Sequence, residues 1–255
     1  MNRYKAIISY DGTLFAGYQV QPQKRTVQLE LEKTLRKLHK GVDIRVTASG
    51  RTDAGVHAKG QVIHFDSPFS FPAENWEKGL NAMLPQDIAV LRVENAKPDF
   101  HARFEASGKE YRYYISLAKK RDPFQRNYAY HFPYELDFSS LEAAIPYLIG
   151  THDFTSFCSA KTEVIDKIRT IREIDFFEEN GMLVFRFVGS GFLYNMVRIL
   201  TGTLLEVATG KKTASDIKQI LEKKDRSYAG KTAPGHGLYL WEVFYDEAEI
   251  ISQDN

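Results

Sequence analysis

Apolar and polar residues along the first hundred positions follow two periods, one of two residues and one of three to four. Alternation over a short stretch is typical of a strand covered on one face, and the longer period is typical of a helix with one buried face. The expected strands span 4–9, 42–48, 61–66 and 88–93, and the expected helices span 27–38 and 73–83. In chain order they are strand, helix, strand, strand, helix and strand, which predicts a ferredoxin-like unit.

The same order of elements returns in the second half of the chain, although the sequence itself does not repeat. Asn180-Gly181 is typical of a tight hairpin, here between strands expected at 164–178 and 183–188. The remaining expected elements are strands at 109–117 and 238–245 and helices at 138–149, 193–209 and 213–224. We therefore expect an α+β fold of two ferredoxin-like (βαββαβ) halves. Their mainly antiparallel sheets are expected to join into one central sheet, with helices on one side and a cleft between the halves.

The domain organisation predicted from these patterns has three parts. Residues 1–100 form an N-terminal half, residues 101–246 form a C-terminal half, and residues 247–255 form an acidic tail. The polar stretch 97–108 is the expected junction, and no long flexible linker separates the halves.

Composition excludes several classes of protein. No apolar run approaches the ~20 residues that cross a bilayer, so we expect no membrane segment. The single cysteine, Cys158, cannot form an internal disulfide and fits a reducing cytoplasm. A thiol nucleophile formed by Cys158 with His152 is less favoured than a cysteine of the core. The histidines show no metal-ligand spacing, so we expect no metal.

The net charge of +1 does not by itself indicate a nucleic-acid partner. Its distribution is more informative, because the last ten residues hold four acidic and no basic side chains, and without them the charge is +5. Basic residues gather at 119–121, at 211–212 and at 223–226. These clusters are either solvated faces or parts of a groove that neutralises phosphates.

The segment 50–58, GRTDAGVHA, joins two of the expected strands and holds an arginine, an acid and a histidine. Two glycines allow it to bend tightly or to approach a ligand closely. Loops carried by a rigid sheet are common positions for catalytic groups. By composition alone, the same segment also fits a polar turn in which Asp53 bonds to its own backbone.

The segment resembles the active-site motif of the TruA-type tRNA pseudouridine synthases, and further stretches from about residue 4 to 245 resemble the same family. They are Tyr10-Asp11-Gly12, KEYRYY at 109–114, FLYNMVR at 192–198, Ala233-Pro234 and GLYL at 237–240. Tyr18 and Val20 depart from the family, which often has tryptophan and arginine there, and Val20 cannot bind a phosphate.

The resemblance implies isomerisation of uridine to pseudouridine in tRNA, at positions 38–40 of the anticodon stem-loop. It implies a cytoplasmic homodimer that needs no cofactor. It places the catalytic aspartate at Asp53, its arginine partner at Arg198 and the active-site tyrosine at Tyr111. Arg51 is placed to occupy the gap left by the displaced uridine or to hold the neighbouring phosphate. His57 and Lys59 are weaker candidates for contacts with the RNA backbone.

The residues themselves support part of this assignment. Arg198 stands in an apolar helix, and a buried arginine requires an anionic partner, for which Asp53 is the candidate. A neighbouring guanidinium favours the ionised carboxylate. Tyr111 stands in an aromatic strand, where most tyrosines belong to the core.

Two other functions remain alternatives. A noncatalytic RNA-binding module is possible, because exposed aromatic residues on sheets stack bases. A glycoside hydrolase or phosphorylase usually needs a second carboxylate close to the first, and the segment 50–58 contains only one.

Overall fold

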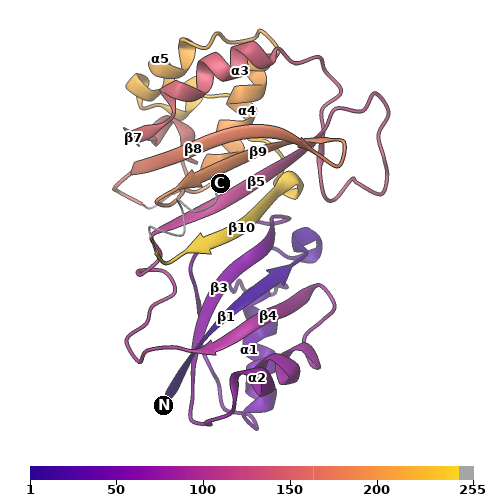
Figure 1. Cartoon of the computed structure of the whole chain (residues 1–255), viewed down its shortest axis with the longest axis vertical. Helices are drawn as coiled ribbons and strands as arrows, with labels where there is room; N and C mark the ends of the chain where they lie inside the picture. Colours follow the sequence, from indigo (N-terminus) through magenta and orange to yellow (C-terminus); the bar gives the residue numbers. More distant parts are fainter. Residues whose placement is uncertain (163, 247–255) are drawn as a thin grey trace. The chain divides into compact units, whose positions relative to one another are not determined.

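The computed structural model describes residues 1–162 and 164–246, so the acidic tail expected at 247–255 lies outside the described residues. The chain forms two compact units. Of the described residues, unit 1 comprises 1–107 and 239–246, and unit 2 comprises those between Gly108 and Leu238. Each unit is an α+β body built on a mainly antiparallel sheet (Figure 1).

The sheet of unit 1 has the strand order β4-β1-β3-β10, with the short strand β2 paired to β3. Its strands are β1 (Asn2–Tyr10), β2 (Val46–Ala48), β3 (His57–Ser67), β4 (Ile88–Asn95) and β10 (Leu238–Phe244). β1 runs antiparallel to β3 and β4, whereas β10 runs parallel to β3 with Tyr239 opposite His57. The alternation at 238–245 correctly predicts a strand, but only the pairing shows that it completes the sheet of unit 1.

Two helices, α1 (Val27–Leu38) and α2 (Ala73–Asn81), cover one face of this sheet (Figure 1). The Thr26 hydroxyl accepts a hydrogen bond from the Leu29 amide and so begins α1. The Trp76 ring of α2 lies 5.3 Å from the Tyr4 ring and 5.4 Å from the Phe65 ring. This buried aromatic cluster joins helix to sheet, and the predicted order βαββαβ is confirmed for unit 1.

The sheet of unit 2 has the strand order β5-β9-β8-β7, with β6 paired to β5. Its strands are β5 (Gly108–Ser116), β6 (Tyr130–His131), β7 (Gly150–Asp153), β8 (Ile168–Glu179) and β9 (Met182–Gly189). All these pairs are antiparallel except β5 with β6. The turn between β8 and β9 has positive φ angles at Asn180 and Gly181, which confirms the hairpin that the Asn-Gly pair predicts.

The helices of unit 2 are α3 (Phe138–Ala144), α4 (Met196–Ala208) and α5 (Asp216–Lys223). Almost every side chain of α4 is buried, as the apolar residues on most of its faces predict. In the part of the chain that is described, no helix is both long and apolar enough to cross a membrane.

Several predicted elements differ from the structure at their ends. The strand expected at 42–48 begins at Val46, and the strand expected at 61–66 begins at His57. The helix expected at 213–224 spans Asp216–Lys223. The helix expected at 138–149 ends at Ala144, and Pro146 lies in a single 3-10 turn that follows, because proline has no amide hydrogen to continue the helix. The strand expected from 164 begins at Ile168. The helix expected from 193 begins at Met196, because Asn195 before it is left-handed with φ +61°. β6 and β7 were not expected, because two to four residues show no period.

Gly202 allows the segment before the last strand to lie directly against α4. A Cβ atom at this position would stand 1.7 Å from the carbonyl oxygen of Lys231. The neighbouring Gly230 amide donates to the Thr203 hydroxyl at 2.9 Å. The backbone of segment 230–234 therefore packs directly on α4, and this close approach requires glycine at position 202.

We expect Gly202→Ala to destabilise the protein by about 1–3 kcal/mol, because the added methyl group must push this segment away. At an exposed position inside a helix, a change from glycine to alanine would instead raise the free energy of unfolding by about 1 kcal/mol. The sign of the measured change in stability therefore distinguishes a tight contact from an open position. Urea denaturation measures the effect. Gly191→Ala is the matched control, because a Cβ atom there meets nothing within 4 Å. A stabilised Gly202→Ala variant would contradict the tight contact.

Candidate functional site

The loop between β2 and β3 is held by neighbouring segments of unit 1. Gln61 on β3 donates from its side-chain amide to the Gly50 carbonyl at 2.8 Å. The backbone amide of Tyr18 donates to the Thr52 carbonyl at 3.0 Å. These bonds hold the backbone on the N-terminal side of Asp53, so the direction in which its carboxylate leaves the loop is restricted.

Asp53 begins a tight turn in which the Val56 amide donates to its carbonyl at 3.1 Å. Gly55 completes the turn with φ +74°, a left-handed angle that favours glycine. Gly17 has φ +103°, and a Cβ atom there would lie 2.9 Å from the Thr52 carbonyl oxygen. Both glycines therefore serve the shape of the loop, which leaves the Asp53 side chain half-buried.

A buried hydroxyl pair lies under the loop. The hydroxyl groups of Tyr10 and Thr52 are 2.8 Å apart, and burial raises the pKa of Tyr10 to about 12, so its proton stays in place at neutral pH. The Tyr18 ring lies 6.4 Å from the Tyr10 ring, and Tyr18 is only 3% exposed. Tyr18 is therefore part of the core that supports the loop, whereas Val20 is exposed.

The other candidates, Arg51 in the loop and His57 and Lys59 at the start of β3, differ in their surroundings. His57 is 2% exposed; its Nδ1 atom accepts the Gly12 amide hydrogen at 3.0 Å, and its ring stacks on Tyr239 at 4.6 Å. Arg51 and Lys59 are exposed. His57 thus joins the start of β3 to β10 and to the turn at Gly12–Leu14, and of these three side chains only Arg51 and Lys59 are open to a ligand.

Tyr111 lies on β5 in unit 2, on the face that the helices cover. It is 8% exposed, and its ring meets the Phe192 ring edge-on at 5.2 Å. The neighbouring position, Glu110, points to the opposite face, because side chains alternate along a strand. The strand therefore presents one aromatic and one charged face.

Glu110 secures this strand with an ion network. Its carboxylate is fully buried and receives the Nε–H of Arg112 at 2.6 Å and the Nε–H of Arg186 at 3.0 Å. Arg186 also pairs with Glu173, and Arg112 with Glu179. A buried carboxylate is stable only when its oxygen atoms are paired in this way, so the network holds β5 and the adjacent Tyr111 in register.

Arg198 lies in the first turn of α4 and is half-buried. Its Nε–H donates to the Ala233 carbonyl at 2.7 Å, and its Nη1 donates to the Asn195 side-chain oxygen at 2.8 Å. The Ala233 amide donates back to the Arg198 carbonyl at 3.0 Å. Two bonds to different nitrogen atoms fix both the position and the plane of the guanidinium.

The segment around Ala233 is itself anchored to β5. Tyr113 donates its hydroxyl to the Pro234 carbonyl at 2.7 Å, and a Cβ atom on Gly237 would lie 2.8 Å from the Tyr113 ring. The Ala233-Pro234 motif thus holds Arg198 and connects it to the strand of Tyr111. The sequence indicates Arg198 but not the supporting roles of Asn195 and the Ala233 carbonyl. Asn195 stands three residues before Arg198 at the same end of the helix, and this spacing is the signal that could have indicated its role.

The predicted site residues therefore belong to two units. Asp53, Arg51 and His57 lie in unit 1, and Tyr111 and Arg198 lie in unit 2. The pairing of Asp53 with Arg198 stays a prediction.

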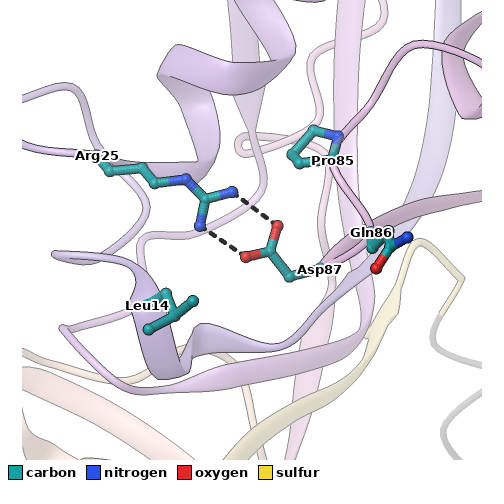
Figure 2. A pocket seen from close by; sticks show the side chains of 5 residues that line it. All are labelled: Leu14, Arg25, Pro85, Gln86 and Asp87. Carbon is teal, nitrogen blue, oxygen red and sulfur yellow. Dashed lines mark hydrogen bonds and ion pairs between the residues drawn. The ribbon is translucent and has the colours of Figure 1, made fainter.

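A shallow hollow of about 470 Å³ lies elsewhere in unit 1. Figure 2 shows its lining by Leu14, Arg25, Pro85, Gln86 and Asp87, with two hydrogen bonds between the arginine and the aspartate. These bonds are 2.6 and 2.8 Å long, and the Arg25 guanidinium also lies over the Phe15 ring. Because its charged groups neutralise each other, the hollow has no obvious ligand.

The remaining side chains that could bind a metal ion or act as a thiol nucleophile were compared with what each of these roles requires. Among residues 1–162 and 164–246, no group of three or more His, Cys, Asp or Glu side chains is arranged to hold a metal ion. Burial raises the pKa of the Cys158 thiol, the opposite of what an activated nucleophile requires. Cys158 is a free, buried cysteine.

Comparison with known proteins gives a consistent result. A family model described as tRNA pseudouridine synthase matches residues 6–105 and 144–246. The tRNA pseudouridine synthase A of Bacillus subtilis (strain 168) is 62% identical over 245 residues, which cover 96% of this chain and 99% of that protein. The tRNA pseudouridine synthase A of Anoxybacillus flavithermus (strain DSM 21510 / WK1) is 60% identical over 246 residues, which cover 96% of this chain and 100% of that protein.

Among solved structures, the crystal structure of a Cbf5-Nop10-Gar1 complex aligns with a TM-score of 0.33 and 12% identity, over 80% of this chain and 54% of that chain. This likeness is too low to carry an argument. Asp53 and Arg198 lie inside the segments that the family model matches, and Tyr111 lies between them.

Proposed function

Because this chain belongs to the tRNA pseudouridine synthase A family, we propose that it isomerises uridine to pseudouridine at positions 38–40 of the tRNA anticodon stem-loop, with Asp53 as the catalytic carboxylate. In this reaction the bond from N1 to C1′ breaks and a bond from C5 to C1′ forms. The C5 hydrogen leaves as a proton, and N1 gains one. The reaction is balanced without an oxidant, a reductant or a group donor, so no cofactor is proposed.

The observation that carries the proposal is the aspartate loop. Its nine residues resemble the active-site motif of the family, and its backbone is held by Gln61, Tyr18 and the turn to Val56. An ionised carboxylate on such a loop attacks C1′, removes a sugar proton or adds to the uracil ring. All three routes need Asp53 to be charged and correctly directed.

Arg198 is the proposed partner of that charge. Nε and Nη1 of its guanidinium donate to Ala233 and Asn195, and an arginine has further N–H groups for a carboxylate. A guanidinium beside Asp53 would favour the ionised form of the acid and fix its direction. Its own two anchors would keep it rigid, which is what an active site requires of a positioning cation.

The remaining residues are proposed to handle the substrate. The uridine must leave its helix to be reached, which costs a few kcal/mol of unstacking. Tyr111 would stack on the displaced uracil, and Arg51, exposed beside Asp53, would occupy the gap or hold a phosphate. His57 is proposed to act on the RNA through the loop that it supports, since it is buried.

The proposed setting of the enzyme follows from its substrate. A protein that modifies tRNA works where tRNA is made and used, so we place it in the cytoplasm. We further propose a homodimer with the RNA lying across both subunits.

A tritium-release assay tests the proposed reaction. Transfer RNA carrying tritium at uracil C5 releases it to water on isomerisation. A noncatalytic RNA-binding module would bind the tRNA and release nothing. A hydrolase would liberate free uracil. Transcripts with a single uridine at position 38, 39 or 40 then identify the modified positions.

We expect Asn195→Ala to lower the turnover rate roughly tenfold or more, because the lost bond to a charged group is worth about 1.5–3 kcal/mol. Affinity for tRNA should stay within about twofold of the wild type. Single-turnover tritium release and a binding titration separate the two. Gln219→Ala, at an exposed position of α5 in the same unit, is the control. An Asn195→Ala variant with the wild-type rate would show that the Ala233 carbonyl alone orients Arg198.

A further inference from the structure

The segment 117–129, called here the basic loop, leaves the end of β5 and returns as β6. In Figure 1 it is the magenta-to-pink trace that projects from the end of β5 without forming a helix or strand. It falls in the interval 106–143 that the family model leaves unmatched.

The two ends of the basic loop are fastened together. β6 pairs in parallel with the end of β5, so that Tyr130 lies opposite Ile115. The Phe132 amide donates to the Ser116 carbonyl at 2.8 Å, and His131 Nε2 donates to the Ala118 carbonyl at the same distance. A loop closed in this way loses less conformational entropy when it binds a ligand.

The tip of the basic loop is also internally ordered. The Asp122 side chain accepts the Phe124 amide hydrogen at 2.8 Å, and its carbonyl accepts that of Gln125 at 3.2 Å. The Gln125 carbonyl in turn accepts the amide hydrogens of Tyr128 and Ala129. Because Ala129 is 3% exposed, the loop is anchored by a buried residue while its tip projects outward.

The side chains at the tip are basic and aromatic. Lys119, Lys120, Arg121 and Arg126 are all exposed, and none of them forms an ion pair within the described residues. With Asp122 as the only acid, the loop carries +3. Phe124 is 85% exposed. Removing a side chain of this kind from water is favourable by about 1.5–3 kcal/mol, so its exposure leaves this free energy available for binding.

We propose that the basic loop is a docking surface for the tRNA substrate, in which the lysine and arginine side chains hold backbone phosphates and Phe124 stacks on an unpaired base. Basic side chains and an exposed aromatic ring together are the usual means of binding single-stranded RNA. An acidic protein would satisfy the charges, but it would give no reason for a flat ring held at the tip of an ordered turn. The proposal rests on the proposed function, because it takes tRNA as the substrate.

The charges are tested with the triple variant Lys119→Gln, Lys120→Gln, Arg121→Gln in the full-length protein. The tRNA dissociation constant should rise at least tenfold near physiological salt. The slope of log affinity against log salt should fall by about 2–3, as three lost phosphate contacts predict. The matched control Lys78→Gln, Lys97→Gln, Lys218→Gln removes the same charge from exposed positions of α2, the loop after β4 and α5. The control should change affinity by less than about threefold.

The ring is tested separately. Phe124→Ala should weaken tRNA binding roughly fivefold or more with an unchanged salt slope, whereas Phe124→Tyr should bind like the wild type and Phe124→Leu like the alanine variant. Thermal unfolding should be unaffected in all of them, since the side chain is exposed. In the tritium assay, the loop variants should raise KM and retain the turnover rate at saturating tRNA.

The outcomes separate this proposal from the function on which it rests. A wild-type protein that releases no tritium overturns the proposed function. An active wild type whose loop variants bind tRNA no worse than the control triple overturns the docking surface. A loop variant with reduced turnover and unchanged KM also overturns it, because the loop would then act on the reaction step.

Discussion

Asp53→Asn is expected to give a folded protein that binds tRNA and releases no measurable tritium, a loss of at least roughly 10³-fold. Asparagine has nearly the same shape, so the hydrogen bonds of the loop backbone from Gln61 and Tyr18 should remain. What it lacks is the negative charge that every route from uridine to pseudouridine requires of this side chain. The result would therefore assign the loss to chemistry and not to folding.

Three measurements make this assignment firm. Thermal unfolding within about 2 °C of the wild type would exclude a folding defect, and an unchanged tRNA dissociation constant would exclude a binding defect. Asp99→Asn, an exposed acid of the same unit, is the matched control and should retain full turnover. Turnover near the wild-type rate in Asp53→Asn would end the proposal, because no other residue of this loop can supply a carboxylate.

Arg198→Lys is expected to have the second largest effect, a fall in turnover of roughly 10²-fold. A lysine keeps the charge, but its ammonium group cannot donate to Ala233 and Asn195 in fixed directions and still present a planar pair of N–H groups to an acid. The variant would therefore keep a positive charge at position 198, but not in the position and orientation of the guanidinium. Transfer RNA affinity should change little, since the proposed partner of Arg198 is Asp53 and not the RNA.

The pH dependence of Arg198→Lys gives an independent test. If the guanidinium holds Asp53 in its ionised form, the acidic limb of the turnover profile should shift to higher pH in the variant, because a less well-placed cation stabilises the carboxylate less. Arg92→Lys, at an exposed position, is the control. An unshifted profile with reduced turnover would mean that Arg198 acts on the substrate instead.

The predicted site residues of the two units are held in place by different kinds of contact. Asp53 is held by backbone hydrogen bonds and glycine turns, whereas Arg198 is held by its own side-chain bonds to Asn195 and Ala233. β5, which carries Tyr111, is secured by the buried charge of Glu110. If the proposed roles hold, each of these contacts would restrict one of the three groups before substrate arrives and so lower the entropy cost of reaching the transition state.

The sequence alone determined the elements with strong local signals. The alternation of β1 and β3, the spacing of apolar residues in α1 and the Asn-Gly turn are local, so they predict structure without knowledge of the rest of the chain. The motif at 50–58 was found for the same reason, because its residues are contiguous. Where the local signal was weak, as in β6 and β7, the elements were missed.

Only the tertiary structure decided which residues at those positions are open and what supports them. The sequence around His57 and Tyr18 is typical of a loop, yet both side chains are buried beside the loop that carries Asp53, because segments far apart in the chain close over them. The bond from Arg198 to Ala233 joins positions 35 residues apart, and β10 pairs with β3 at the other end of the chain. Such contacts depend on how the whole chain packs, and a local pattern carries no information about packing partners distant in sequence.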